Sequence, residues 1–331
     1  MVFSFICPFL VSLLMLILII YFSHRYKFFM DDANCNKPQN YHAYSTPRAG
    51  GAGIVLGILF FIFTPLGSKL LLPVILAFLS GIFEDFHNSL SPKRRLILQI
   101  IAALSAIWLT DSVVTYLGLG ISIPYWIGIL FSVFAIVGMM NAINIIDGFN
   151  GLASGVILLI LFSFATTVYR QENFDMLYII LVTGGAVSGF FLLNFPKGKI
   201  FLGDGGAYML GFIVAIIGIF LAAKYESVSP WYILAVFIYP AWEVLFSIIR
   251  KLYMGLSPMQ PDTYHLHMLI YRRITHNNPL TALFIVASLL PFITFSTIFP
   301  NKSITNIIVC CCFIVCYMLL YRYLYKKEIS G

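Results

Sequence analysis

Short polar motifs interrupt an otherwise apolar sequence, and their side chains could do chemistry together. Carboxylates end two apolar runs, at Glu84-Asp85 and at Asp147, and Asp204 stands in a Gly-Asp-Gly-Gly motif. Two histidines, His265 and His267, follow in a later polar segment. Carboxylates and amides without cysteine suit a hard cation such as Mg²⁺ or Mn²⁺, which often completes its shell with substrate phosphates.

Amides accompany the second carboxylate. Asn141, Asn144 and Asp147 are spaced i, i+3 and i+6, so a helix would place all three on one face. Polar side chains at the edge of a membrane are costly unless they have partners. Gly148 and Gly151 follow directly, and glycines let the backbone turn sharply and approach a ligand closely. This pattern favours a binding site over an ordinary helix end.

Basic side chains lie near the same motifs. Arg48, Arg95 and Lys199 could supply contacts to phosphate oxygens. Acid, amide, base and glycine together indicate phosphoryl transfer at a membrane surface. A water-soluble phosphate donor and a lipid acceptor would explain why such a site lies at the interface.

Each motif taken alone also fits a plainer interpretation as helix caps and solvated loop charges. Asp204 before glycines could be an N-cap, and the acidic pair could be interfacial. His265 and His267, flanked by Asp262, could be loop histidines or part of an anion or metal site. All these clusters are predicted to lie on one face of the membrane, which favours a common site.

Composition identifies the elements that must position these residues. The chain has 331 residues, of which 60% are hydrophobic and 10% charged, against about 25% charged in a soluble domain. A helix needs about 20 apolar residues to cross the hydrocarbon core. We therefore predict one all-α integral membrane domain, residues 1–331, with about eleven transmembrane helices. The predicted spans are residues 2–22, 49–66, 69–83, 96–111, 122–140, 152–169, 176–193, 206–223, 230–249, 279–298 and 304–321.

The distribution of charge predicts the orientation. All but four of the 20 Lys and Arg residues fall in alternate polar segments and the C-terminal tail. The positive-inside rule makes these segments cytoplasmic, with the N-terminus periplasmic and the C-terminus cytoplasmic. The basic charge is thus explained by topology, and no nucleic-acid partner is expected. The candidate site segments, all on the cytoplasmic face, are residues 23–48, 84–95, 141–151, 194–205 and 250–278.

The motifs in their order resemble the polyprenyl-phosphate N-acetylhexosamine-1-phosphate transferase superfamily, of the glycosyltransferase family 4 type. The resemblance runs from about residue 45 to 275. It rests on Pro47-Arg-Ala-Gly-Gly51, the acidic pair with Ser91-Pro-Lys-Arg-Arg95 and Gln99, residues 141–153, Asn194-Phe-Pro196, residues 201–206 and residues 261–267. The superfamily includes phospho-N-acetylmuramoyl-pentapeptide transferase and undecaprenyl-phosphate N-acetylglucosamine-1-phosphate transferases.

The resemblance implies a reaction and a location. A UDP-N-acetylhexosamine and undecaprenyl phosphate would give UMP and a polyprenyl-diphospho-sugar, with Mg²⁺ as cofactor and Mn²⁺ as a substitute. The enzyme would be a multi-pass protein of the bacterial inner membrane with its site facing the cytoplasm, and it could form a homodimer. The step would begin a cell-surface polysaccharide such as O-antigen.

The resemblance also implies residue roles. Asp204 would ligate Mg²⁺, and Glu84 with Asp85 would form the acidic pair near the lipid phosphate. His265 and His267 would contact the donor diphosphate or sugar. The nucleotide pocket would be lined by Asn141, Asn144, Asp147 and Asn150, with Asn194 nearby.

Four positions depart from the family pattern. Glu84 and Asn150 stand where the family usually or often has Asp, Thr263 where Arg is common, and Met268 where a third His often follows. These departures favour the O-antigen-type branch and leave the sugar open. The reaction could be a direct attack by the acceptor phosphate, whose second pKa is about 6, or proceed through a carboxylate nucleophile. The sequence does not choose between them.

A nucleotide-sugar or lipid-linked sugar transporter is the rival function. Transporters place polar residues near the bilayer midplane on broken helices. Here the predicted spans hold almost no ionisable residue inside them. The exception is Glu243, for which a buried hydrogen-bonding role is expected. This distribution favours the transferase.

Overall fold

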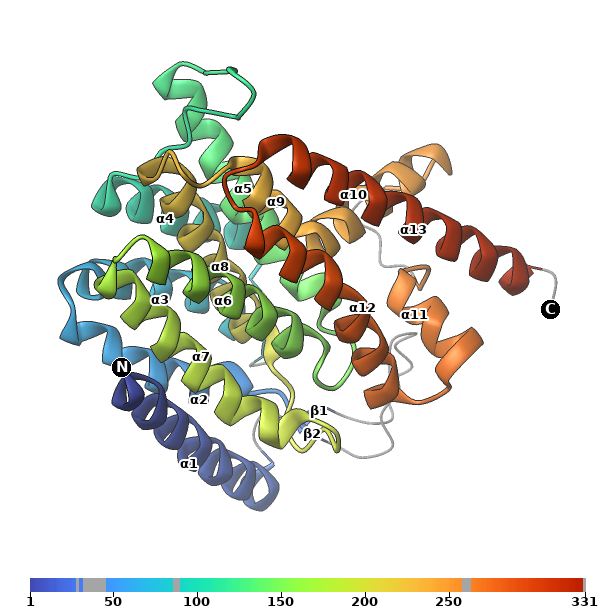
Figure 1. Ribbon diagram of the computed structural model, residues 1–331. Helices are drawn as coiled ribbons and strands as arrows, with labels where there is room; N and C mark the ends of the chain where they lie inside the picture. The colour runs from blue at the N-terminus through green and yellow to red at the C-terminus, as the bar shows by residue number, and fades with distance from the viewer. Residues whose placement is uncertain (28–29, 32–45, 86–89, 258–262, 330–331) are drawn as a thin grey trace.

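The computed structural model of the chain describes residues 1–27, 30–31, 46–85, 90–257 and 263–329. The described part is almost entirely helical, with one pair of two-residue strands (Figure 1). Its elements are α1 (Val2–Tyr26), β1 (Met30–Asp31), β2 (Thr46–Pro47), α2 (Gly50–Ile58), η1 (Leu59–Phe63), α3 (Pro65–Asp85), α4 (Pro92–Thr110), α5 (Tyr125–Ile146), α6 (Leu152–Arg170), α7 (Phe174–Asn194), α8 (Gly203–Lys224), α9 (Pro230–Val236), α10 (Ile238–Tyr253), α11 (Leu266–Ile270), η2 (Tyr271–Thr275), α12 (Asn278–Ile298) and α13 (Ser303–Ile329).

Within the described residues, eight helices are long and apolar enough to cross a membrane, or nine if α9 and α10 form one bent span. This confirms an all-α polytopic architecture. The remaining predicted spans are also helical but weaker candidates. Helix α2 with η1 is short, and α4 begins with the basic run Lys93-Arg94-Arg95. The number eleven and the orientation of the termini stay predictions.

Two helices extend beyond the spans that the sequence predicted and include polar motif residues. Helix α3 begins at Pro65 and includes the acidic pair, whereas the predicted span covered residues 69–83. Helix α5 continues to Ile146, beyond the predicted end at residue 140. Asn141 and Asn144 therefore belong to a regular helix, and only Asp147 lies past its end.

The predicted span 230–249 is broken rather than straight. Helices α9 and α10 meet at 79°, with Phe237 between them. Pro240 has no N–H to bond the carbonyl of Val236, which is four residues earlier and is the last residue of α9. The bend therefore falls where proline removes a helical hydrogen bond.

Helix α8 forms the centre of the bundle. It is buried along almost its whole length and packs against α2, α3, α5 and α6. A helix that is apolar on all sides is expected in such a position. At its beginning, a Cβ on Gly51 of α2 would lie 2.5 Å from the Gly206 Cα, and a Cβ on Gly81 of α3 would lie 2.4 Å from the Asp204 carbonyl carbon. Glycines thus bring three helices into backbone contact beside Asp204.

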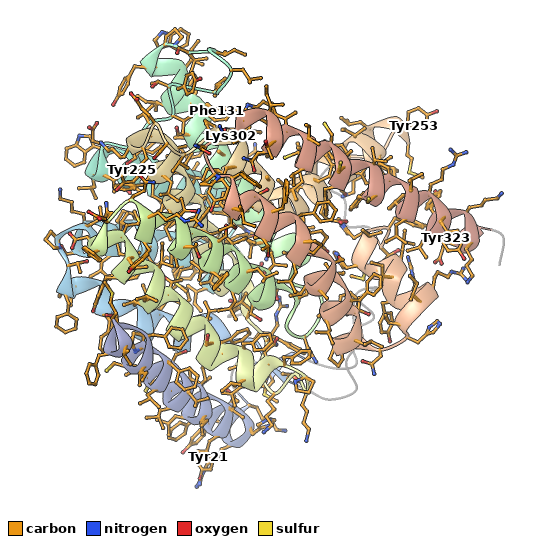
Figure 2. The ribbon with its side chains drawn as sticks, viewed as in Figure 1. Tyr21, Phe131, Tyr225, Tyr253, Lys302 and Tyr323 are labelled. Atoms are coloured by element: carbon orange, nitrogen blue, oxygen red, sulfur yellow. The ribbon has the colours of Figure 1, made fainter. Side chains whose placement is uncertain are left out.

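The periphery is apolar and aromatic. Helix α1 lies along α7 at one edge of the bundle, and α13 runs along another edge to the C-terminus (Figure 1). Tyr21 of α1, Tyr253 of α10 and Tyr323 of α13 project outward (Figure 2). Exposed apolar side chains over most of the outer helices are what contact with lipid requires.

Candidate active site

Two of the sequence motifs meet through their backbones. The Phe201 N–H donates to the Pro47 carbonyl at 2.9 Å, and the Gly50 N–H donates to the Phe201 carbonyl at 2.8 Å. The Gly51 N–H continues the pairing to the Leu202 carbonyl at 2.8 Å. This pairing brings the segment that contains Arg48 against the beginning of α8. Sequence reasoning named both motifs but did not predict that they pair.

Side chains from three other segments of the chain approach the Asp204 carboxylate. Its carboxylate accepts a hydrogen bond from Asn144 Nδ2 at 3.0 Å and lies 3.4 Å from Arg48 Nη2. Arg95 Nη1 lies 3.8 Å from its second oxygen. Asp204 lies inside the first turn of α8, whose N-cap is Leu202, so the N-cap interpretation of Asp204 is wrong. With 16% of its side chain exposed, Asp204 can be reached by a ligand.

Asp85 performs the capping role instead, from a different helix. Its two oxygens accept the backbone N–H groups of Asp204 at 3.1 Å and Gly205 at 3.2 Å. Gly203 has φ +77°, and a Cβ there would lie 2.7 Å from Asp85 Oδ2, so only glycine fits this approach. Asp85 lies beyond the apolar span Pro65–Phe83. Burial, and then repulsion from Asp204, raise the pKa of Asp85 to about 7.

Asp147 joins the same electrostatic cluster. It follows the last residue of α5. Burial raises the pKa of Asp147 to about 7; Arg48 opposes this, while Asp204 and Asp85 add to it. The three carboxylates thus interact electrostatically. We call Asp85, Asp147 and Asp204 the acidic cluster. With two neighbouring guanidiniums, the fully ionised cluster would keep an excess negative charge.

The chemistry of the acidic cluster fits a divalent cation. In the described part of the chain, no group of three His, Cys, Asp or Glu side chains is placed so that it could already hold a metal. Mg²⁺, however, usually takes only one or two protein carboxylates and completes its shell with water and substrate phosphates. Burial and the neighbouring carboxylates raise the pKa values of Asp85 and Asp147 more than Arg48 and the backbone N–H groups lower them. A cation beside Asp204 would favour the ionised forms.

Further side chains orient the members of this site. Asn141 Nδ2 donates to Gln99 Oε1 at 3.0 Å and to the Val137 carbonyl at 2.8 Å, so its oxygen is the atom left to face a ligand. Arg95 Nη1 donates to the Tyr208 hydroxyl at 2.8 Å. Neither Gln99 nor Tyr208 was among the predicted site residues. The one available signal was that Tyr208 follows Asp204 by four residues on the same helix.

Asn150 and Asn194 bind neighbouring loops together. Asn194 accepts the Gly151 N–H at 2.6 Å and donates to the Ile200 carbonyl at 2.8 Å. Asn150 Nδ2 donates to the Pro196 carbonyl at 3.0 Å. These bonds hold the turn after α5. The contact of Asn150 and Asn194 with a nucleotide stays a prediction. Lys199 is exposed and makes no side-chain hydrogen bond or ion pair to the residues that the structure describes.

The two histidines lie beside the turn after α5. The His265 and His267 rings stack with their centroids 5.3 Å apart. His267 packs edge-on against Phe149 at 5.7 Å, and a Cβ on Gly148 would lie 3.7 Å from His267 Nε2. Because Gly148 follows Asp147, the histidines and the acidic cluster border the same turn. The Glu84 side chain and Asp262 lie outside the described residues.

Comparison with known proteins finds similarity over parts of the chain. Residues 68–222, a little under half of the chain, match the family model of glycosyl transferase family 4. The chain is 33% identical over 189 residues to the phospho-N-acetylmuramoyl-pentapeptide-transferase of Streptococcus agalactiae, an alignment that covers 55% of this chain and 54% of the relative. It is 28% identical over 313 residues to the decaprenyl-phosphate N-acetylglucosaminephosphotransferase of Mycobacterium leprae, covering 82% and 78%.

Coverage by these relatives is uneven. The chain spans about half the length of the Streptococcus relatives, including one from Streptococcus pyogenes that is 35% identical over 148 residues. Asp85, Asp147 and Asp204 fall inside the segment that matches the family model, whereas His265 and His267 fall outside it. The printed names of the relatives differ in the group transferred, so the O-antigen-type branch stays a prediction.

Proposed function

We propose that this chain transfers an N-acetylhexosamine-1-phosphate from a UDP-sugar to undecaprenyl or another polyprenyl phosphate, releasing UMP. The observation that carries the proposal is the convergence of Asp85, Asp147 and Asp204 with Arg48 and Arg95 at one end of the central helix. Such a set suits a nucleotide diphosphate and its cation. The names of the relatives support the same class of reaction.

The reaction balances with the acceptor phosphate as nucleophile. An oxygen of the polyprenyl phosphate attacks the sugar-bearing phosphorus of the donor. A new P–O–P bond forms, the bond to the bridging oxygen breaks, and that oxygen leaves with UMP. Mg²⁺ bound at Asp204 would neutralise charge on the diphosphate. Arg48 and Arg95 then turn from Asp204 toward phosphate oxygens, and Asn144 keeps the Asp204 carboxylate in orientation.

The contacts of Asp85 favour direct transfer over a covalent intermediate. Both of its oxygens already accept backbone N–H groups at the beginning of α8. A carboxylate held in this way is stabilised as an acceptor and is a poor nucleophile. The acceptor phosphate, mostly a dianion at neutral pH because its second pKa is about 6, needs little help from a base.

We further place the site on the cytoplasmic face of a bacterial inner membrane, because the basic residues gather in the segments that carry it. A reporter fused after Gly331 should be cytoplasmic, and a tag before Met1 should be periplasmic. A C-terminal reporter that is active only in the periplasm would contradict this orientation.

The function is tested with purified protein in detergent. Given polyprenyl phosphate, Mg²⁺ and a panel of UDP-N-acetylhexosamines, the protein should release UMP without any gradient or sealed vesicle. EDTA should stop the release, and Mg²⁺ or Mn²⁺ should restore it. If none of the donors yields UMP and UDP-sugar is instead taken up into vesicles, the proposal is contradicted and the transporter is favoured. The panel also identifies the N-acetylhexosamine, which the sequence leaves open.

A further inference from the structure

A buried carboxylate stands directly behind the histidine pair. Glu243 lies on α10 with 1% of its surface exposed. Its Oε1 accepts the backbone N–H of Leu266 at 3.0 Å and lies 3.0 Å from His265 Nδ1. Its Oε2 accepts the hydroxyl of Tyr317, on α13, at 2.9 Å. Three elements distant in sequence thus converge on one carboxylate.

These contacts determine which nitrogen of His265 carries hydrogen. The Leu266 N–H can only donate, and the Tyr317 hydroxyl donates to the second oxygen, so both carboxylate oxygens act as acceptors. An ionised Glu243 offers acceptors only, so its contact with His265 is best matched by an Nδ1–H that donates. The opposite nitrogen, Nε2, consequently points away from Glu243. Stacking against His267, with 4° between the ring planes, fixes the orientation of the ring as well.

Burying a carboxylate within an apolar helix costs free energy, and hydrophobic side chains of similar size could fill the same space. The sequence supplies instead a glutamate with one oxygen bonded to a histidine and the backbone beside it, and the other bonded to Tyr317. The same arrangement, in which a buried carboxylate selects the tautomer and orientation of an imidazole, recurs where the imidazole contacts a substrate or a metal.

We propose that Glu243 is a positioning residue for the transfer reaction: it holds His265 with hydrogen on Nδ1 and directs Nε2 to the donor diphosphate or sugar. Tyr317 holds the carboxylate from α13. The proposal rests on the proposed function only in naming what His265 contacts. The protonation and orientation of His265 can be measured without any assay of activity.

The choice of variants follows from the contacts. In Glu243→Gln, the Leu266 N–H still needs an acceptor, so the amide oxygen should keep the Oε1 position and continue to accept from His265. The amide nitrogen would then face the Tyr317 oxygen, which can accept. In Glu243→Leu, the space is filled but both acceptors are lost. Tyr317→Phe is the matched control, because it removes only the hydrogen bond on the far oxygen.

The first measurement is nitrogen–proton correlation NMR on protein with ¹⁵N-labelled histidine, with a His265→Gln variant to assign the signal. Wild type and Glu243→Gln should show His265 with hydrogen on Nδ1, and Glu243→Leu should show mixed tautomers. A wild-type His265 with hydrogen on Nε2 alone would overturn the proposal, whether or not any variant folds.

The second measurement is steady-state UMP release at varied UDP-sugar. Glu243→Gln should keep kcat/KM within about fivefold of wild type, because it keeps the acceptor. Glu243→Leu should lose about tenfold to a hundredfold, mostly through the donor KM, and Tyr317→Phe should lose less than tenfold. Unchanged kcat/KM in Glu243→Leu would overturn the proposal. If wild type releases no UMP, the proposed function fails, while the NMR result still decides whether Glu243 positions His265.

Discussion

The carboxylates of the acidic cluster and that of Glu243, which lies behind the histidine pair, have opposite surroundings. Asp85 and Asp147 lie near each other and near Asp204, and the pKa of each of the first two is raised to about 7. Glu243, by contrast, is surrounded by three hydrogen-bond donors. The difference is that the acidic cluster carries negative charge that a cation could offset, whereas Glu243 has its hydrogen-bond donors within the protein. The two regions should therefore respond differently to substitution, metal and pH.

The largest effect is expected at Asp204. Asp204→Asn keeps the shape of the side chain but removes the charge that would hold the cation. A metal clamp on a phosphoryl group contributes several kcal/mol at the transition state, and each 1.36 kcal/mol is tenfold in rate. UMP release should fall by roughly a hundredfold or more.

The matched control for Asp204→Asn is Asp111→Asn. Asp111 is exposed and pairs with Lys224 at 3.1 Å, away from the acidic cluster. An exposed ion pair contributes little to stability, so turnover should stay near wild type. Near-normal turnover by Asp204→Asn at matched, monodisperse protein concentration would remove this residue from the metal site.

The next effect is expected at Asp85 and has two parts. In Asp85→Asn, the amide nitrogen would face one of the N–H groups of Asp204 and Gly205, so one cap bond to α8 is lost. Turnover should fall by roughly tenfold to a hundredfold, and the melting temperature should also fall. Lost turnover with an unchanged melting temperature would show that the cap bonds contribute nothing to stability.

A smaller and different effect is expected on the histidine side. His267→Ala should raise the KM for the UDP-sugar by about tenfold, because His267 borders the turn after Asp147 through Phe149 and Gly148. The dependence on Mg²⁺ concentration should not change. His24→Ala, at an exposed position on α1, serves as the control. A shift of the Mg²⁺ dependence in His267→Ala would mean that the two regions are not separable in this way.

The smallest effect concerns pH and thermal stability. Because the folded protein raises the pKa of Asp85 and Asp147 from 3.8 to about 7, it binds more protons than the unfolded chain between these values. Metal-free stability should therefore fall as pH rises from about 4 to about 7. Mg²⁺ favours the ionised forms, so its stabilising effect should be larger at about pH 8 than at about pH 5.5. Melting curves in EDTA and in Mg²⁺ check this, and equal gains at both pH values would contradict it.

The sequence predicted those parts of the fold and site that depend on local pattern. Apolar length located the helical segments, and short polar motifs identified Asp204, Asn144, Arg48 and Arg95, which the structure brings together. The buried hydrogen-bonding role expected of Glu243 is confirmed. Its partner Tyr317 was missed because 74 residues separate the two, and only tertiary packing joins them.

Other differences have equally physical causes. The Asp204 side chain looked like a helix cap in sequence, but a carboxylate from α3 caps α8 instead. Both ends of the Asn194 amide bind neighbouring loops, which the sequence did not predict, and its contact with a nucleotide stays a prediction. In each case the residue type was informative, and the choice of partner depended on which helices lie side by side.

The central claim, that the acidic cluster holds the divalent cation of the reaction, is tested most directly by Mn²⁺ binding. Electron paramagnetic resonance of purified protein titrated with Mn²⁺ reports free metal, with and without a UDP-sugar. Wild type and Asp111→Asn should bind Mn²⁺ alike, and more tightly when the UDP-sugar adds its phosphates to the shell. Asp204→Asn should bind at least roughly tenfold more weakly in both conditions. Equal Mn²⁺ affinity in wild type and Asp204→Asn would contradict the account.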